Sequence, residues 1–92
     1  MSHLESHLLS GQLEEGRVVL SCKRGMADTL TIYARRDGEK DYMELDESND
    51  KIVDARPKLD PSRPEIRRYY AMLLYSGDEI RKKSNEIVLI VP

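Results

Sequence analysis

The feature that most constrains the fold is a strict two-residue alternation across 29–34, where Leu, Ile and Ala alternate with Thr and Tyr. An alternation of this period is typical of a β-strand with one face buried and the other in water. The stretch 36–39 follows it and contains Asp-Gly, a pair that tolerates the positive φ angles of tight hairpin turns. The sequence therefore predicts an antiparallel hairpin whose second arm is 42–45, where apolar and acidic residues alternate again.

Two further segments have the composition of strands. The stretch 18–22 is β-branched and apolar at its start, and 52–55 is a short apolar segment that follows a polar turn at 47–50. Strands joined by short turns pair with their neighbours in most small sheets. We therefore expect an antiparallel β-meander of about four strands between residues 18 and 55.

A helix is predicted for 62–75. Ser62 and Glu65 are spaced as in a capping box, and Pro64 lies in the first turn, where its missing N–H is harmless. Ser76-Gly77 is a typical helix end. One face of this helix would carry five apolar or aromatic side chains: Ile66, Tyr69, Tyr70, Leu73 and Leu74.

The two ends of the chain give weaker patterns. Ser2 and Glu5 also fit a capping box, so a short helix is expected near the N-terminus, ending at Gly11 or Gly16, with 1–15 forming a helical or flexible arm. Near the other end, Ile87-Val88-Leu89-Ile90-Val91 is an unbroken apolar run. A strand with one wet face would alternate, so this strand is expected to be buried on both faces.

Together these elements predict a single α+β domain over 1–92, in which one well-capped helix packs on the meander. The segment 78–84 fits either a helical turn or an arm of a hairpin around Ser84-Asn85. Charged residues make up 35% of the chain and the net charge is −2, so much of the surface must be ionic. The aromatic set is five Tyr with no Phe or Trp, which suits half-buried positions at the rim of a core.

The compartment is inferred from cysteine use and apolar run length. Cys22 is the one cysteine, so no internal disulfide can form, and we expect it to be a buried core side chain. The first ten residues do not resemble a signal peptide, and no apolar run is long enough for a membrane span. These observations favour a cytoplasmic protein with no membrane contact.

Charge is unevenly distributed. Residues 37–54 contain eight acidic and two basic groups, a net charge of −6. A solvated surface is the plain interpretation, and a ridge that binds a basic partner, as an inhibitor or a mimic of a phosphate backbone, is an alternative. The candidate acidic face consists of Asp37, Glu39, Asp41, Glu44, Asp46, Glu47 and Asp50.

Residues 55–92 have the opposite bias, with eight basic and five acidic groups. Arginines near the start of the predicted helix, with tyrosines beside them, could contact phosphates and stack on bases. The overall acidic charge weakens this nucleic-acid hypothesis, which stays an alternative. Its candidate contacts, equally available to a protein partner, are Arg63, Arg67, Arg68, Tyr69, Tyr70, Lys82 and Lys83.

No catalytic, cofactor or metal site is predicted. His3 and His7 would share a helix face but lack a third ligand. A calcium loop beginning at Asp46 would place Lys51 where glycine is required and Pro57 where a bidentate glutamate is required. We therefore expect a non-enzymatic interaction or regulatory protein that acts through protein contacts and forms a homodimer, because a strand apolar on both faces needs cover in so small a domain.

Overall fold

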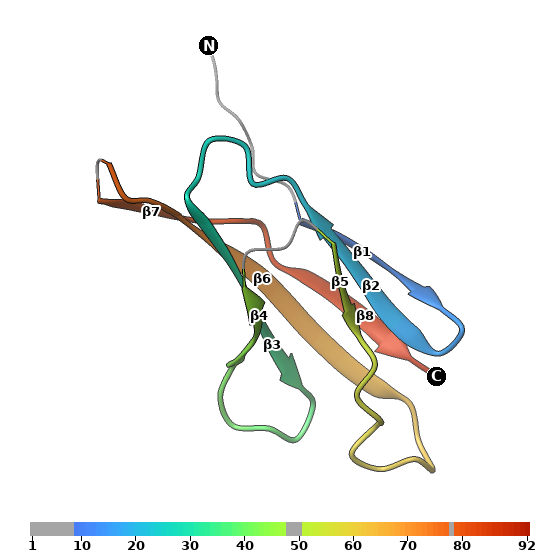
Figure 1. Ribbon diagram of the computed structural model, residues 1–92. Coiled ribbons are helices and arrows are strands. Elements are labelled where there is room, and N and C mark those ends of the chain that lie inside the picture. The colour runs from blue at the N-terminus through green and yellow to red at the C-terminus, as the bar shows by residue number, and fades with distance from the viewer. Residues whose placement is uncertain (1–8, 48–50, 78) are drawn as a thin grey trace.

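The computed structural model describes residues 9–47, 51–77 and 79–92, and within them the fold is all-β (Figure 1). The expected α+β class is therefore wrong, since no helix occurs in the described part of the chain. No helix there could cross a membrane, as none is long and apolar enough. The strands are β1 (Leu9–Glu14), β2 (Arg17–Cys22), β3 (Thr29–Arg36), β4 (Met43–Glu47), β5 (Lys51–Asp54), β6 (Glu65–Tyr75), β7 (Ile80–Lys83) and β8 (Ile87–Val91).

The strands form two antiparallel sheets. One has the order β1-β2-β5, and the other has the order β4-β3-β6-β7, with β8 pairing the first half of β6. β6 is the longest strand and runs diagonally through Figure 1, with β3 on one side and β8 followed by β7 on the other. Because β6 is paired on both sides, it is the centre of the larger sheet.

The predicted helix 62–75 is replaced by a loop and β6. Side chains along 65–73 alternate between buried and partly exposed, which is the period of a strand. Because apolar residues lie on both faces of this strand, their spacing also fits the period of a helix, and this is why the helix prediction was wrong. The expected capping box is absent too, because the Glu65 carboxylate accepts a hydrogen bond from Leu59 N at 2.8 Å. Ser76-Gly77 was predicted to end a helix, but it is a turn that ends β6 and leads into β7.

The four expected central strands exist, but their meander order is wrong. The hairpin of β3 and β4 is confirmed, with Glu39 N donating to Arg36 O at 2.9 Å and Gly38 at φ 101°. β2, however, pairs with β1 and β5 and not with β3. After β2 the chain crosses to the other sheet, so the turn between β2 and β3 reverses the chain without pairing these two strands. The expected turn at 47–50 falls mostly on residues outside those described.

The expected N-terminal helix is contradicted where it can be judged. Residues 1–8, including most of that segment with His3 and His7, lie outside the described residues. Leu9–Glu14 is a strand paired with β2, and the predicted helix end at Gly16 is instead a hairpin turn. Glu15 and Gly16 have φ angles of 52° and 79°, as a two-residue turn between twisted strands requires.

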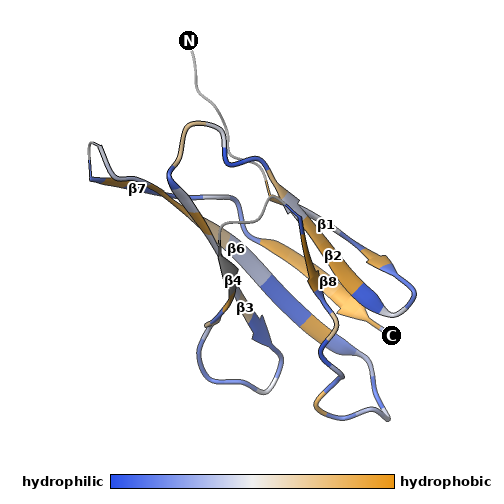
Figure 2. Ribbon diagram, in the orientation of Figure 1, coloured by the Kyte–Doolittle hydropathy of each residue, from blue (hydrophilic) through white to orange (hydrophobic). Residues whose placement is uncertain are grey.

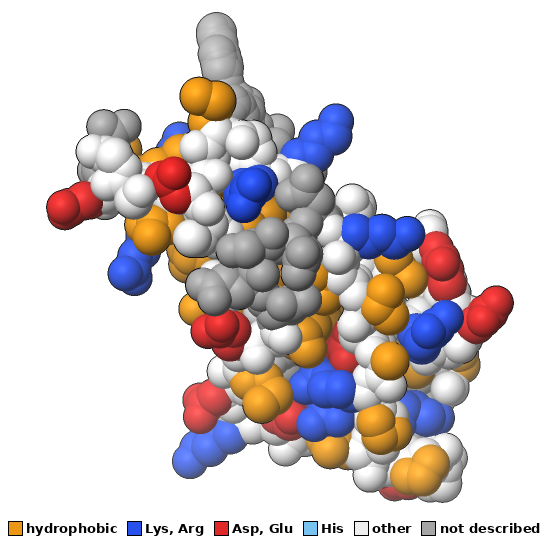
Figure 3. Space-filling view, in the orientation of Figure 1, with side chains coloured by type: hydrophobic (Ala, Val, Ile, Leu, Met, Phe, Trp, Pro, Cys, Tyr) orange, Lys and Arg blue, Asp and Glu red, His pale blue; other side chains and the backbone are white. Residues whose placement is uncertain are grey.

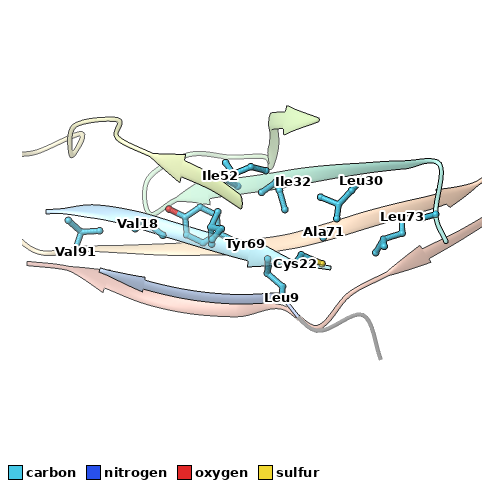
Figure 4. Packing of buried hydrophobic residues seen from close by; sticks show 13 residues of the cluster. Leu9, Val18, Cys22, Leu30, Ile32, Ile52, Tyr69, Ala71, Leu73 and Val91 are labelled. Atoms are coloured by element: carbon cyan, nitrogen blue, oxygen red, sulfur yellow. The ribbon is translucent and has the colours of Figure 1, made fainter. Parts of the chain in front are cut away.

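The core lies between the sheets, where side chains from both point toward one another (Figure 4). β1 and β8 close one side of it, and Gly11 allows their approach, since a Cβ there would lie 2.8 Å from Ile87 Cδ1. The Asn85 side chain also joins the sheets, accepting from Leu9 N at 2.7 Å and donating to Leu9 O at 3.0 Å. The buried apolar residues are Leu9, Val18, Leu20, Cys22, Ala27, Leu30, Ile32, Ala34, Ile52, Tyr69, Ala71, Leu73 and Val91.

The C-terminal strand is not buried on both faces, contrary to expectation. Ile87 and Leu89 pack against the core, whereas Val88 and Ile90 point the other way and are 51% and 58% exposed. Figure 2 shows β8 as a continuous hydrophobic strand, although only one of its faces meets the core. The unbroken run therefore reflects an apolar outer face as well as a buried inner one.

Candidate binding face of the larger sheet

The alternation along β6 divides the sequence-predicted contacts between two environments. Arg67 and Tyr69 point into the molecule and are almost completely buried, whereas Arg68 and Tyr70 point outward from the larger sheet and are partly exposed. The strand places neighbouring residues on opposite faces, so only half of this set can reach a ligand.

The inward residues belong to a buried ionic network. Arg67 Nε donates to Glu65 Oε2 at 2.6 Å, and Arg67 Nη1 lies 3.3 Å from Asp54 Oδ2. Asp54 also accepts from Tyr69 Oη at 2.7 Å and from Arg56 Nε and Nη2 at 2.8 and 3.0 Å. Each buried carboxylate thus faces a guanidinium, which is the condition for burying charge without a large penalty.

The network shifts the acidities of its members. Burial by itself would raise the pKa of Asp54, but hydrogen bonds from Arg56 and Tyr69 and the charge of Arg56 outweigh burial, so the pKa is lowered. Burial and the neighbouring Asp54 carboxylate both raise the pKa of the Tyr69 phenol. Asp54 is therefore held ionised and Tyr69 neutral, with its proton donated to the carboxylate.

The same network holds the proline-rich connection between β5 and β6. Arg67 Nη2 donates to Arg56 O at 2.8 Å, and Arg36 Nη1 donates to Pro57 O at 3.2 Å. These bonds tie the start of the connection to β6 and β3. Arg67 and Tyr69 are consequently structural, and neither is available to a partner.

Three tyrosines gather on the outer face of the larger sheet. Tyr33 of β3 and Tyr70 of β6 are direct register partners, and their rings stack with centroids 5.2 Å apart and planes at 19°. Tyr42, from the β3–β4 loop, meets Tyr70 edge-on at 5.0 Å. Its hydroxyl donates to the carboxylate of Glu86, across the sheet, and burial together with this hydrogen bond raises the pKa of Tyr42. These contacts fix the rings in place.

Three basic side chains surround the tyrosines. Lys83 Nζ lies 4.4 Å from the centroid of the Tyr70 ring, and the Arg35 guanidinium carbon lies 5.9 Å from that of Tyr42. Arg35 and Arg68 are register partners on adjacent strands and share the parity of the tyrosines. We call this group the basic–tyrosine face, and it consists of Tyr33, Tyr42, Tyr70, Arg35, Arg68 and Lys83.

The other basic candidates lie elsewhere. Arg63 is exposed in the connection before β6, beside an open depression. Two carboxylates that line it are already engaged, Glu65 in the buried network and Asp60 with Ser62 at 2.6 Å. Lys82 is exposed on β7 with the parity opposite to that of Lys83. The described residues contain no group of three His, Cys, Asp or Glu placed to hold a metal ion.

The candidate acidic residues do not share one environment. Asp37, Asp41 and Glu44 are exposed, and Glu44 lies opposite Tyr33 in the β3–β4 register. Glu39 is mostly buried and binds Arg36 at 2.8 Å, which lowers the pKa of its carboxyl. The side chains of Asp46 and Glu47, and all of Asp50, lie outside what the structure describes. In the space-filling view, basic and acidic side chains are interspersed, without a block of one sign (Figure 3).

Arg35, Tyr33 and Tyr42 were missed by the sequence reasoning as site residues. Tyr33 could have been found from the sequence, because the alternation in 29–34 places it on the polar, outward face of a strand. Comparison of the chain with protein-family models, curated proteins and solved structures found no match.

Proposed function

We propose that the protein is a non-enzymatic interaction protein that associates with a second copy of itself. The proposal rests on one observation: three apolar side chains lie together on the outer face at the end of the larger sheet. We call this group, Ile66, Val88 and Ile90, the apolar end. Contiguous exposed apolar side chains of this kind mark association surfaces in small proteins.

The apolar end has a simple geometry. Ile66 of β6 and Ile90 of β8 are register partners, and Val88 lies two residues before Ile90, so all three point the same way. A two-fold axis over this patch would place it against its own copy, as in the isologous contact of most homodimers. The strand order therefore supports a face-to-face dimer in which β8 of each copy lies at the contact.

The size of the patch indicates weak association. Val88 and Ile90 are about half exposed, so burying the remainder contributes about 1 kcal/mol for each side chain. Association itself costs about 4 kcal/mol or more in lost translational and rotational freedom. We therefore expect a reversible, concentration-dependent dimer and not an obligate one.

Sedimentation velocity over a range of protein concentrations tests the proposal. Wild type should shift from monomer toward dimer as concentration rises, and Ile90→Lys should weaken this association at least about tenfold. Val53→Lys is the matched control, because Val53 is 46% exposed but lies in β5 of the other sheet. A monomer at every concentration, or equal effects of the two substitutions, would contradict the proposed interface.

The absence of catalysis is part of the same proposal. The buried carboxylates of Asp54 and Glu65 are both occupied by arginines, which leaves neither free as a general base. Cys22 is 2% exposed, so it cannot meet a substrate without opening of the core. A single buried cysteine also supports our placement of the protein in a reducing compartment such as the cytoplasm.

A further inference from the structure

We propose that the basic–tyrosine face binds single-stranded nucleic acid, with bases stacking on Tyr33 and Tyr70 and phosphates contacting Arg35, Arg68 and Lys83. This site adjoins the apolar end on the same outer face, since Arg68 is the register partner of Val88, but its tyrosines, Arg35 and Lys83 lie on other strand positions and the proposal does not rest on self-association. Sheets that bind single strands commonly combine exposed aromatic rings, which stack on unpaired bases, with basic groups that follow the backbone.

The aromatic part of the site is preorganised. Tyr33 and Tyr70 lie side by side on adjacent strands and stack on each other, which orders both rings before any ligand arrives. Tyr42 supports Tyr70 at its edge and is itself tied to Glu86. A ligand that stacks on these rings therefore loses little affinity to the ordering of side chains.

The basic part of the site lacks internal counter-charges. Arg35 and Arg68 face each other directly across β3 and β6, an arrangement of like charges that destabilises a sheet unless an anion lies between them. In the described part of the chain, neither guanidinium nor the Lys83 ammonium forms an ion pair with a carboxylate. Arg68 and Lys83 thus remain available for phosphate oxygens, whereas Arg35, whose Nη1 donates to Glu39 O at 3.0 Å, can offer only its other N–H groups.

Lys83 links the two parts of the site. Its ammonium lies over the ring of Tyr70 at 4.4 Å, where an incoming base could replace it and release it toward the adjacent phosphate. The long lysine side chain makes this movement easy, since it rotates freely about its stem. Unpaired bases can reach the rings in this way, whereas bases stacked inside a duplex cannot.

The acidic neighbours limit the expected affinity. Glu44 lies opposite Tyr33, Glu86 holds Tyr42, and the whole chain has a net charge of −2. Binding should therefore be detectable mainly at low ionic strength. With three phosphate contacts, the logarithm of the association constant should fall with the logarithm of salt concentration with a slope of about −2, because single strands release about 0.7 counterion per contact.

Fluorescence anisotropy with labelled oligothymidylate and oligouridylate of about 12 nucleotides tests the proposal. Lys83→Glu should weaken binding and make the salt dependence shallower, and Tyr33→Leu should weaken it roughly tenfold at constant charge. The matched charge control is Lys51→Glu, on an exposed position of the smaller sheet, which should change affinity much less. Circular dichroism checks that each variant remains folded, and Tyr33→Phe, which keeps the stacking ring, should restore binding.

Several outcomes separate the ligand classes. Preference for the single strand over a duplex of the same length, together with losses for Lys83→Glu and Tyr33→Leu, supports the site. No binding at about 20 mM salt overturns it, as does equal weakening by Lys51→Glu and Lys83→Glu. Binding of an acidic polyglutamate peptide in place of either oligonucleotide also overturns it and points to an acidic protein partner. Ile90→Ser removes apolar area without adding a charge to the face that carries Arg68, so it should weaken self-association and still bind the oligonucleotides, which distinguishes failure of self-association from failure of this site.

Discussion

Replacement of Arg67 by Met should remove much of the stability of the fold. Arg67 is 1% exposed and pairs with both Glu65 and Asp54, so the substitution leaves two buried carboxylates with one fewer guanidinium. Breaking a buried pair by removal of one partner costs about 3–5 kcal/mol. A chain of this length has about 5–14 kcal/mol of net stability in total, so the loss is a large share of it.

Urea unfolding followed by circular dichroism measures this effect. With a slope of about 1–2 kcal/mol/M for a small protein, the midpoint should fall by roughly 2 M or more. Arg68→Met is the matched control, because Arg68 is the next residue of β6 but points outward from the sheet. Its substitution should change stability by no more than about 0.5 kcal/mol. Equal losses for the two variants would refute the assignment of opposite faces, and with it the account of the buried network.

Two further substitutions test the core. Asp54→Asn should destabilise the protein at neutral pH, and the difference in stability from wild type should shrink as pH falls below about 4. The reason is that a carboxyl whose folded pKa is lowered contributes stability above its unfolded pKa and loses that contribution as it protonates. Urea midpoints measured from pH 7 to 3 would show this, and a constant difference would count against an ionised Asp54. Gly11→Ala should lower the free energy of unfolding by about 1–3 kcal/mol, because the new Cβ would lie 2.8 Å from a δ-carbon of β8. Gly77→Ala is the control and should cost much less, because its Cβ would meet nothing within 4 Å. Similar losses for both variants in thermal or urea unfolding would contradict the packing of β1 on β8.

The sequence predicts the local elements of the first half better than their arrangement. The alternation at 29–34 and the Asp-Gly turn after it predict the hairpin of β3 and β4, because both signals are local and agree. The pairing of β2 with β5 was missed, since contacts between distant strands leave no periodic signal in either one, and the hairpin of β1 and β2 was missed because 1–15 was interpreted as a helical or flexible arm. The positions of β2, β3, β4 and β5 could thus be predicted, whereas β1 and the strand order could not.

The segment 65–75 failed for a different physical reason. A strand with apolar residues on both faces has no clean two-residue period, and its side chains then also fit a helix. The inward charges Glu65 and Arg67 add to the ambiguity, because a buried charge is recognised only when its partner is known, and Asp54 is eleven residues before the start of β6. For the candidate site, the sequence analysis predicted Arg68, Tyr70 and Lys83 as contacts but included Arg67 and Tyr69 with them. Only the assignment of 65–75 as a strand shows that Arg67 and Tyr69 lie on the buried face.

One face of β6 holds the fold together, and the other is the face that we propose binds single-stranded nucleic acid. Side-chain NMR of the tyrosines during titration with oligothymidylate at low salt tests both parts in a single experiment. Resonances of Tyr33 and Tyr70 should shift progressively and saturate, and Tyr42 should follow them through its contact with Tyr70. Tyr69, buried on the opposite face of the same strand, should remain unchanged. Shifts at Tyr69 equal to those at Tyr70, or no shift at Tyr33 and Tyr70 when oligothymidylate is in large excess, would contradict the account.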